Sequence, residues 1–325
     1  MRKLAPVLLL ALPGCEGRQA MLGADGSDGA LFADLWWVFV VVTIVFYLLV
    51  LLGLALALMR RRRDGADGEP ILRSGLLVWI GVISVGLVGL TFASWFADRT
   101  MNRALGAAPL TIELTAHQWW WDVRYSNDDP AQVLRTSNEL HLPAGVPVRV
   151  ILKSADVIHS FWIPNLSGKQ DMIPGRINDI FIRPQKVGVF RGQCAEFCGA
   201  QHAHMALDVT VEPRAEFEKW WARSLLPARV PTTPLQRAGY AYVTTRECST
   251  CHAIVGTPAG GLVGPDLTHV ASRLSLGAGT FPMTRGHLYA WIADPQSAKP
   301  GNQMPVIGLQ PAELRAVTEY VGSLK

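Results

Sequence analysis

The sequence predicts a multidomain membrane protein in which a two-helix transmembrane hairpin precedes an all-β domain and an all-α domain. Two uncharged apolar runs near the N-terminus are each long enough to span a bilayer. The middle of the chain alternates short β-rich runs with proline and glycine turns, which is typical of an all-β domain. The C-terminal part ends in a segment with the apolar spacing of a helix.

Composition limits the classes of protein to consider. The chain has 325 residues, half of them apolar, and a formal net charge of +4. This length allows two or three domains, and the modest charge does not indicate nucleic-acid binding. Every cysteine falls in a recognisable chemical context, so none is left over for a structural disulfide; the cysteines are Cys15, Cys194, Cys198, Cys248 and Cys251.

The first residues have the pattern of a bacterial export signal. Arg2 and Lys3 precede an apolar run, and a Leu-Pro-Gly-Cys segment follows it, so we expect a signal peptide over residues 1–14. The segment resembles a lipoprotein signal, in which the mature chain begins at a lipid-carrying Cys15. Pro13 is unusual at its position, so ordinary cleavage nearby, or none, is the alternative.

The hairpin is predicted over residues 35–97, with helices at 35–59 and 76–97. Neither span contains an ionisable residue, so this chain alone offers no proton path. Arginines crowd the short loop between the spans, and the positive-inside rule places that loop in the cytoplasm and both chain ends outside it; they are Arg60, Arg61, Arg62, Arg63 and Arg73.

The all-β domain is predicted over residues 108–224. Its strand-like runs include 110–121, 139–152, 177–184 and 205–213, and they predict an antiparallel β-sandwich. Alternation of apolar and polar residues does not distinguish one kind of sandwich from another.

A soft-ligand motif lies in this domain. Cys194, Cys198, His202 and Met205 supply two thiolates, an imidazole and a thioether, which suit copper. A mononuclear blue-copper site uses one thiolate, whereas two thiolates can bridge two copper ions, and such a pair requires a second imidazole. His159, at the end of an apolar run, is the best source of that imidazole.

A disulfide or a zinc site would account for this motif less well than copper does. A disulfide would close a cramped ring and leave His202 and Met205 without a role. A zinc site has no use for the methionine. We expect the neighbouring His204 to face solvent or to form a hydrogen bond rather than bind metal.

The C-terminal part begins with a proline-spaced linker, predicted over residues 225–236, and a domain over residues 237–325. The run Cys248-Ser249-Thr250-Cys251-His252 is the C-x-x-C-H motif that attaches c-type haem through two thioether bonds and one axial histidine. A redox dithiol or a zinc site would not need His252.

The sixth iron ligand must come from later in the chain. Met304 is the best choice because Pro300, Gly301 and Pro305 make its loop rigid, and that loop resembles the methionine loop of class I cytochromes c. The competing ligands are Met283, His269 and His287. The segment 264–267 (GPDL) resembles the loop that packs beside the axial histidine in that family, and 311–324 has the spacing of a closing amphipathic helix.

Together, HSFWIP at 159–164 and CAEFCGAQHAHM at 194–205 resemble the binuclear copper site, called CuA, of subunit II of haem-copper cytochrome c oxidases. With the haem motif, essentially the whole chain resembles subunit II of a caa3-type oxidase. The resemblance implies a Greek-key cupredoxin domain, a class I cytochrome c domain and two copper ions. It also implies the copper ligands, with Glu196 contributing its backbone carbonyl: His159, Cys194, Glu196, Cys198, His202 and Met205.

The resemblance implies three further roles. The Glu196 carboxylate would point toward a magnesium ion shared with subunit I. In the family an exposed tryptophan accepts electrons for the copper, and Trp119 matches that position. Trp119 belongs to an aromatic patch at 119–121. In a strand these side chains alternate in direction, so at least one ring should face out. Core packing is the alternative, and a fused donor could move the point where electrons arrive. Glu69 is a weak candidate for a family glutamate that serves a proton channel.

The implied function is that of a cytochrome c oxidase subunit in a bacterial cell membrane. An external cytochrome c or similar donor would reduce the haem, and electrons would pass through CuA to subunit I, which reduces oxygen to water; subunit III and membrane lipid are further partners. Nitrous oxide reductase would need more histidines, a copper carrier would not need haem, and a quinol-oxidase subunit would lack the copper ligands. A haem and copper carrier serving another respiratory reductase is the remaining alternative.

Overall fold

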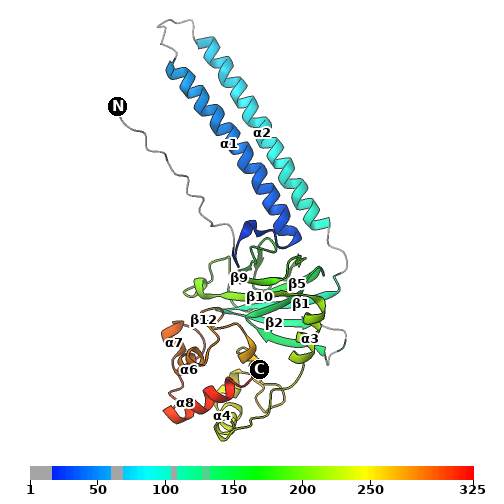
Figure 1. Cartoon of the computed structure of the whole chain (residues 1–325). Coiled ribbons are helices and arrows are strands. Elements are labelled where there is room, and N and C mark those ends of the chain that lie inside the picture. The colour runs from blue at the N-terminus through cyan, green and yellow to red at the C-terminus, as the bar shows by residue number, and fades with distance from the viewer. Residues whose placement is uncertain (1–16, 60–68, 104–107, 127–128, 130–131) are drawn as a thin grey trace, which may run out of the picture. The chain divides into compact units, whose positions relative to one another are not determined.

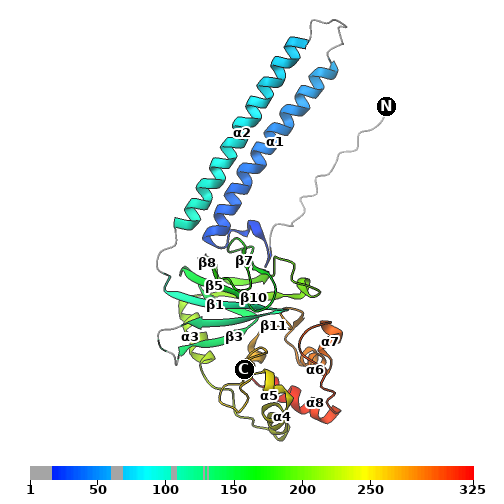
Figure 2. The same cartoon turned by 180° about the vertical axis from the view of Figure 1, so that it is seen from behind.

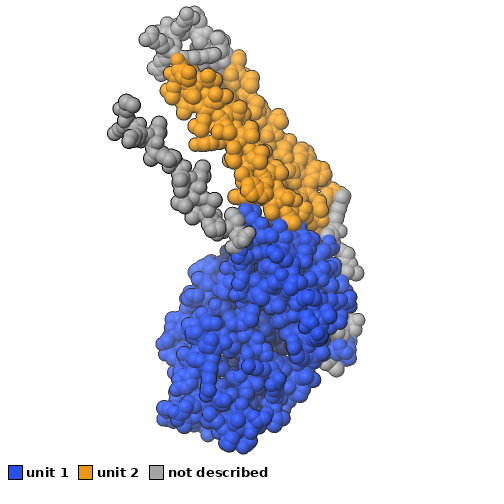
Figure 3. All heavy atoms as spheres, in the orientation of Figure 1, with its two compact units in different colours: residues 1–29, 108–325 blue, residues 30–107 orange. Residues whose placement is uncertain are grey.

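The computed structural model describes residues 17–59, 69–103, 108–126, 129 and 132–325 (Figure 1). The predicted signal peptide, Cys15 and the loop arginines 60–63 lie outside these residues. Two compact units divide the chain, one formed by residues 1–29 and 108–325 and the other by residues 30–107 (Figure 3).

The smaller unit is a pair of long helices, α1 (Ser27–Met59) and α2 (Glu69–Arg103). Both helices extend beyond the apolar runs that predict them, and each is long and apolar enough to cross a membrane. Gly86 faces the ring of Phe46 on the other helix, and an added Cβ would lie 2.9 Å from it. The glycine therefore lets the two helices approach closely.

Among its described residues, the β-rich part of the larger unit contains ten strands, one α-helix and the short 3-10 helix His202–His204. Figure 2 shows its sheets from behind. The elements are β1 (Leu110–His117), β2 (Trp120–Ser126), β3 (Leu134–Ser137), β4 (Glu139–Pro143), β5 (Val148–Ser154), β6 (His159–Phe161), β7 (Gln170–Met172), β8 (Asn178–Ile182), β9 (Gly188–Gln193), β10 (Ala206–Glu212) and α3 (Arg214–Ser224).

These strands form two principal sheets, with orders β3-β2-β1-β5-β8 and β4-β10-β9. The pair β1 and β5 and the pair β4 and β10 are parallel, so the predicted sandwich is correct but its purely antiparallel arrangement is wrong. The chain leaves the first sheet after β3 to form β4 in the second sheet and then returns as β5. Such crossings place strands with the same direction next to each other.

The core of this domain lies between the sheets. Along β1 every second residue from Ile112 to Ala116 is fully buried, which is the pattern of a strand with one face on a core. Helix α3 covers one end, where the rings of Phe217, Trp220 and Trp221 pack around Tyr125 at centroid distances of 5.3–6.5 Å.

The C-terminal domain is largely helical. Its elements are α4 (Pro234–Thr245), α5 (Glu247–Cys251), β11 (Ser275–Leu276), β12 (Phe281–Pro282), α6 (Arg285–Ala293), α7 (Pro295–Ala298) and α8 (Pro311–Val321). Thr233 and Gln236 form a capping box at the start of α4. Gly239 lets α4 approach α8, because a Cβ there would collide with the Ala316 carbonyl.

One feature of this domain was predicted from the sequence and another was not. The predicted closing helix is confirmed as α8, whose buried face includes Leu314, Val317 and Tyr320. The small ladder of β11 and β12 was not predicted. Within the predicted linker, the Ala228 N–H donates to the Val255 carbonyl, so this part of the linker packs against the C-terminal domain.

Candidate metal and haem centres

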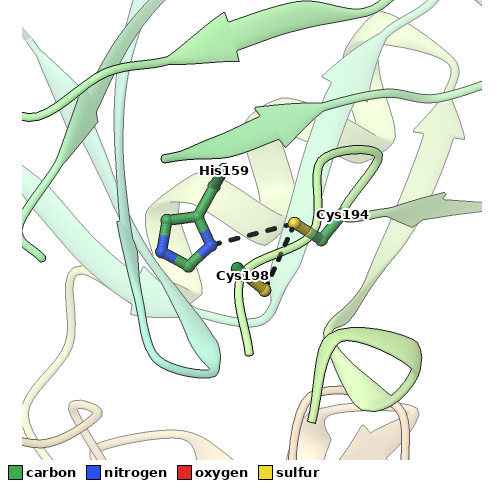
Figure 4. Close-up of side chains that lie close together, drawn as sticks. All are labelled: His159, Cys194 and Cys198. Atoms are coloured by element: carbon green, nitrogen blue, oxygen red, sulfur yellow. Dashed lines mark hydrogen bonds between the residues drawn. The ribbon is translucent and has the colours of Figure 1, made fainter. Parts of the chain in front are cut away.

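Three side chains of the predicted copper site converge. His159 lies at the start of β6, and Cys194 and Cys198 lie in the loop after β9. The Cys194 sulfur is 3.8 Å from His159 Nδ1 and 3.7 Å from the Cys198 sulfur (Figure 4). All three residues are at most 2% exposed, so these groups are held together in a water-poor environment.

The other predicted ligands join the same cluster. His202 Nδ1 is 3.6 Å from the Cys198 sulfur, and the Met205 sulfur is 3.9 Å from it. The Glu196 carbonyl oxygen is 3.2 Å from the Cys194 sulfur. Each imidazole therefore lies against a different cysteine, and two thiolates, two imidazoles and a thioether form a donor set that suits copper. His204 is exposed and hydrogen-bonded to Gln201, as expected.

Asp156 orients one ligand and was not among the residues predicted from the sequence. Its Oδ1 lies 2.8 Å from His159 Nε2, and its Oδ2 accepts a 2.6 Å hydrogen bond from the backbone N–H of Gln118. Burial alone would lower the pKa of His159, but the hydrogen bonds with Cys194 and Asp156 outweigh it and raise that pKa. Because Asp156 engages Nε2, Nδ1 is left to face the sulfurs. The D-x-x-H spacing was the available signal.

The pKa values of the two thiols are shifted in opposite directions. The hydrogen bond between the two sulfurs lowers the pKa of Cys194 and raises the pKa of Cys198. The Cys198 carbonyl is also occupied, because it accepts hydrogen bonds of 2.9 Å from Trp119 Nε1 and 2.7 Å from Gln118 Nε2. The loop that carries the second thiol is thereby fixed to the turn between β1 and β2.

The expectation that at least one ring of the tryptophan patch faces out is wrong. Trp119, Trp120 and Trp121 are 8%, 9% and 1% exposed. Trp119 does not lie in a strand, because β1 ends at His117 and β2 begins at Trp120. The C-terminal domain covers its ring, and a Cβ added at Gly301 would lie in ordinary van der Waals contact with it, at 3.7 Å.

A cavity of about 280 Å³ lies in the C-terminal domain, and all four predicted haem-binding residues line it: Cys248, Cys251, His252 and Met304. Much of the remaining wall is apolar, as a porphyrin requires; it includes Val243, Leu276, Leu288, Ile292, Val317 and Val321. The β-rich domain closes one side of the cavity with Gln118, Trp119 and Trp120.

The geometry of His252 suits an axial ligand. Its Nδ1 lies 2.7 Å from the Pro265 carbonyl oxygen, which fixes the ring and leaves Nε2 free to bind iron. Burial lowers the pKa of His252 and so favours the neutral imidazole. Gly264 packs so closely on the ring that an added Cβ would lie 2.8 Å from it, so the prediction that the GPDL segment packs beside the histidine is confirmed.

The three competing ligands have other surroundings. His269 is 3.0 Å from the Leu226 carbonyl, and the His287 ring stacks on Phe281 at a centroid distance of 5.1 Å. Met283 lines a different, polar pocket. Met304, by contrast, lines the same cavity as His252, and hydrogen bonds from Gln296 and to Asn302 hold its backbone.

Comparisons with known proteins identify both domains. The family described as "Cytochrome C oxidase subunit II, periplasmic domain" matches residues 128–212, and "Cytochrome c" matches residues 236–325. Cytochrome c oxidase subunit 2 of Alkalihalophilus pseudofirmus is 30% identical over 98% of this chain and 95% of its own length. The protein of that name from Bacillus sp. strain PS3 is 31% identical over 77% of this chain and 72% of its own length.

Among solved structures, the periplasmic domain of subunit II of the Bradyrhizobium japonicum cytochrome oxidase is 32% identical and covers 37% of this chain and 96% of that domain, with a TM-score of 0.35. The two domains imply copper and haem c as cofactors. The chain belongs to the cytochrome c oxidase subunit 2 family, with a cytochrome c domain at its C-terminus; it is anchored in a membrane, associates with subunit I and delivers electrons to the oxidase.

Proposed function

We propose that the copper centre holds two ions bridged by the thiolates of Cys194 and Cys198. One observation carries this proposal: each imidazole lies against a different sulfur, His159 at 3.8 Å from Cys194 and His202 at 3.6 Å from Cys198. Met205 and the Glu196 carbonyl, which lie near opposite sulfurs, supply one weak ligand for each ion. The ligand set is thereby divided into two similar halves.

In the C-terminal domain Cys248 and Cys251 would attach the haem covalently, and His252 and Met304 would bind its iron. When bound, the copper pair and the haem accept and release single electrons. The protein contributes fixed ligands, a buried copper cluster and a largely apolar haem cavity.

Trp119 is the residue that we place between the two centres. Its side chain lines the haem cavity, and its Nε1–H donates to the carbonyl of Cys198 at 2.9 Å. One residue therefore connects the wall of the haem cavity with a copper ligand through a single hydrogen bond. In this chain Trp119 would accept electrons from the tethered haem, because the C-terminal domain covers it.

The remaining assignments follow the family pattern. The half-buried Glu196 would direct its carboxylate toward a magnesium ion shared with subunit I. An external cytochrome c or similar carrier would reduce the haem, and subunit III and membrane lipid would complete the surroundings. The arginine-rich loop would lie in the cytoplasm and both chain ends on the periplasmic side.

A non-catalytic copper carrier is the second candidate, and the burial of the thiols argues against it. Metal exchange with a partner requires sulfur ligands that the partner can reach, whereas Cys194 and Cys198 are each 2% exposed. A carrier also gives no reason for a haem cavity beside the copper domain.

Electron paramagnetic resonance of the oxidised full chain, loaded with copper and haem in detergent, tests the proposal. A hyperfine pattern from one electron shared over two copper nuclei, beside a low-spin c-type haem, is expected. A pattern from a single copper nucleus would exclude the bridging role of one thiolate.

A further inference from the structure

The C-terminal domain contacts the copper domain through buried groups. The Ala206 N–H, directly after the copper ligand Met205, donates to the Ala278 carbonyl of the β11–β12 turn at 2.9 Å. The Gln201 side chain, 7% exposed, donates to the Pro300 carbonyl at 2.8 Å. We call the buried contact formed around Trp119, Ala206 and Ala278 the interdomain surface.

Lys299 lies at the centre of this surface and is 2% exposed. Its Nζ donates to the Trp119 carbonyl at 2.7 Å, the His204 carbonyl at 2.7 Å and the Gly277 carbonyl at 2.9 Å. The first two acceptors belong to the copper domain and the third to the C-terminal domain. An ammonium has three N–H donors, so the three carbonyls satisfy all of them.

A buried lysine is costly, and its burial lowers the pKa of Lys299 to about 7. No acidic side chain among the described residues lies within salt-bridge distance of its Nζ. An apolar side chain would fill the same space without that cost. The buried Lys299 amino group is therefore explained by the three parts that its hydrogen bonds connect: the Trp119 turn, the copper-ligand loop and the C-terminal domain.

A second anchor lies elsewhere on the same surface. Arg273, 7% exposed, donates to the Asp266 carbonyl at 2.6 Å within its own domain, and its Nε is 3.5 Å from a Glu139 carboxylate oxygen on β4. The Ser275 hydroxyl donates to the Asp208 carboxylate on β10. Weak electron-transfer encounters use small surfaces, whereas here a buried Arg273 lies against the Glu139 carboxylate and a buried Lys299 donates to carbonyls of both domains.

We propose that Lys299 is a positioning residue that locks the C-terminal domain onto the copper domain and holds the haem cavity against Trp119. This inference rests on the proposed function of Trp119 and deepens it. In the locked chain the residues that would hold the haem and those that would hold copper stay at a fixed separation, so an electron given up by a bound haem would reach the copper pair across one contact. A tethered domain that docked and separated would instead limit transfer by its own motion.

Hydrogen–deuterium exchange of the copper- and haem-loaded full chain in detergent provides the test. Lys299→Met keeps a long side chain and removes the donors. It should speed exchange at the Ala206 amide by about tenfold or more, as expected when hydrogen bonds of a charged group are lost. The Cys194 amide, which donates to the Met205 carbonyl inside the copper domain, should keep its protection. The matched control is Lys219→Met, because Lys219 is 65% exposed and pairs with Glu216 on the surface.

A second readout separates positioning from general destabilisation. After flash reduction of the haem, transfer to copper should slow by about tenfold or more in Lys299→Met and should become dependent on solvent viscosity, while wild type and Lys219→Met stay independent of it. Copper resonance and haem absorption should be unchanged in every variant. Those spectra test the proposed function separately, because neither Lys299 nor Lys219 is a proposed ligand of copper or haem.

Wild-type protection of Ala206 together with a wild-type transfer rate in Lys299→Met would overturn the proposal. If Lys299→Met fails to retain either cofactor, Lys299→Gln decides, because its amide restores part of the donor set. An Ala206 exchange rate in Lys299→Gln between that of wild type and that of an undocked chain supports the positioning role. Wild-type protection of Ala206 in Lys299→Gln, together with a wild-type transfer rate that does not depend on viscosity, overturns the proposal.

Discussion

The copper ligands contact one another directly, whereas the haem ligands surround a cavity. In the copper cluster the sulfur and nitrogen atoms of neighbouring ligands lie 3.6–3.9 Å apart inside a single β-rich domain. The haem cavity, of about 280 Å³, is closed by residues of two domains. The first site is therefore specified by local hydrogen bonds, and the second by covalent attachment, apolar lining and interdomain packing. Damage to one should leave the other intact.

The largest effect should come from removing the haem anchors. The double variant Cys248→Ser/Cys251→Ser should lose covalent haem, and the apolar cavity should then destabilise the C-terminal domain by about 3 kcal/mol or more, by analogy with large buried cavities. Haem staining and unfolding followed by circular dichroism measure this change. The copper resonance should persist; its loss to the same extent would show that the two sites fold as one.

A substitution of Asp156 tests whether damage to the copper cluster leaves the haem cavity intact. Asp156→Asn weakens the contact that orients His159, so copper affinity should fall about 10- to 100-fold, as for other partners of metal-bound histidines. Competition with a chelator measures the affinity, and haem absorption should not change. Asp179→Asn is the control, because that residue is 39% exposed and pairs with Arg149 on the surface. Equal affinity in the two variants would contradict the role of Asp156.

Met205 should affect the spectrum of the copper centre more than the stability of the protein. Met205→Leu removes the thioether 3.9 Å from the Cys198 sulfur but nearly conserves volume, so the cost in unfolding free energy should stay below about 1.5 kcal/mol. The copper hyperfine pattern should change while the haem spectrum stays constant. An unchanged pattern would remove Met205 from the ligand set.

His141 tests a region outside both centres. Burial alone would lower its pKa, but hydrogen bonds with Glu139 and Glu212 outweigh that effect and raise it. A raised folded-state pKa contributes stability that is complete below the ordinary value of 6.5 and is lost as pH rises through the raised value. His141→Gln should therefore be less stable than wild type at pH 6, with the difference shrinking at higher pH.

Thermal melts from pH 6 to pH 9 measure that difference, and copper and haem spectra should not change with the substitution. A difference that is constant over this range would mean that packing on Trp220, where the rings stack at 4.0 Å, dominates the contribution of His141.

The sequence predicted the parts whose chemistry depends on residue type. Few other uses exist for the two cysteines and two histidines of the copper motif, or for the C-x-x-C-H motif, at their spacing. The structure brings the copper ligands together in one cluster and places the haem-binding residues around one cavity. Asp156 was not predicted, because the D-x-x-H spacing does not by itself show the turn that brings this carboxylate onto His159. Core packing of Trp119 was the stated alternative, but the expected exposed ring in the patch was wrong, since alternation within a strand describes neither a turn nor a covering domain. The parallel strand pairs arise from crossings between sheets that no local pattern encodes.

The interdomain surface limits how freely the two redox modules can be exchanged. A copper domain cut after residue 224 would leave the Asp208 and Glu139 carboxylates without their Ser275 and Arg273 partners and would expose the Trp119 ring to water. A foreign cytochrome c fused at the same position would have to supply equivalents of Lys299 and of the β11–β12 turn. The two domains should therefore be exchanged between related proteins together and not singly.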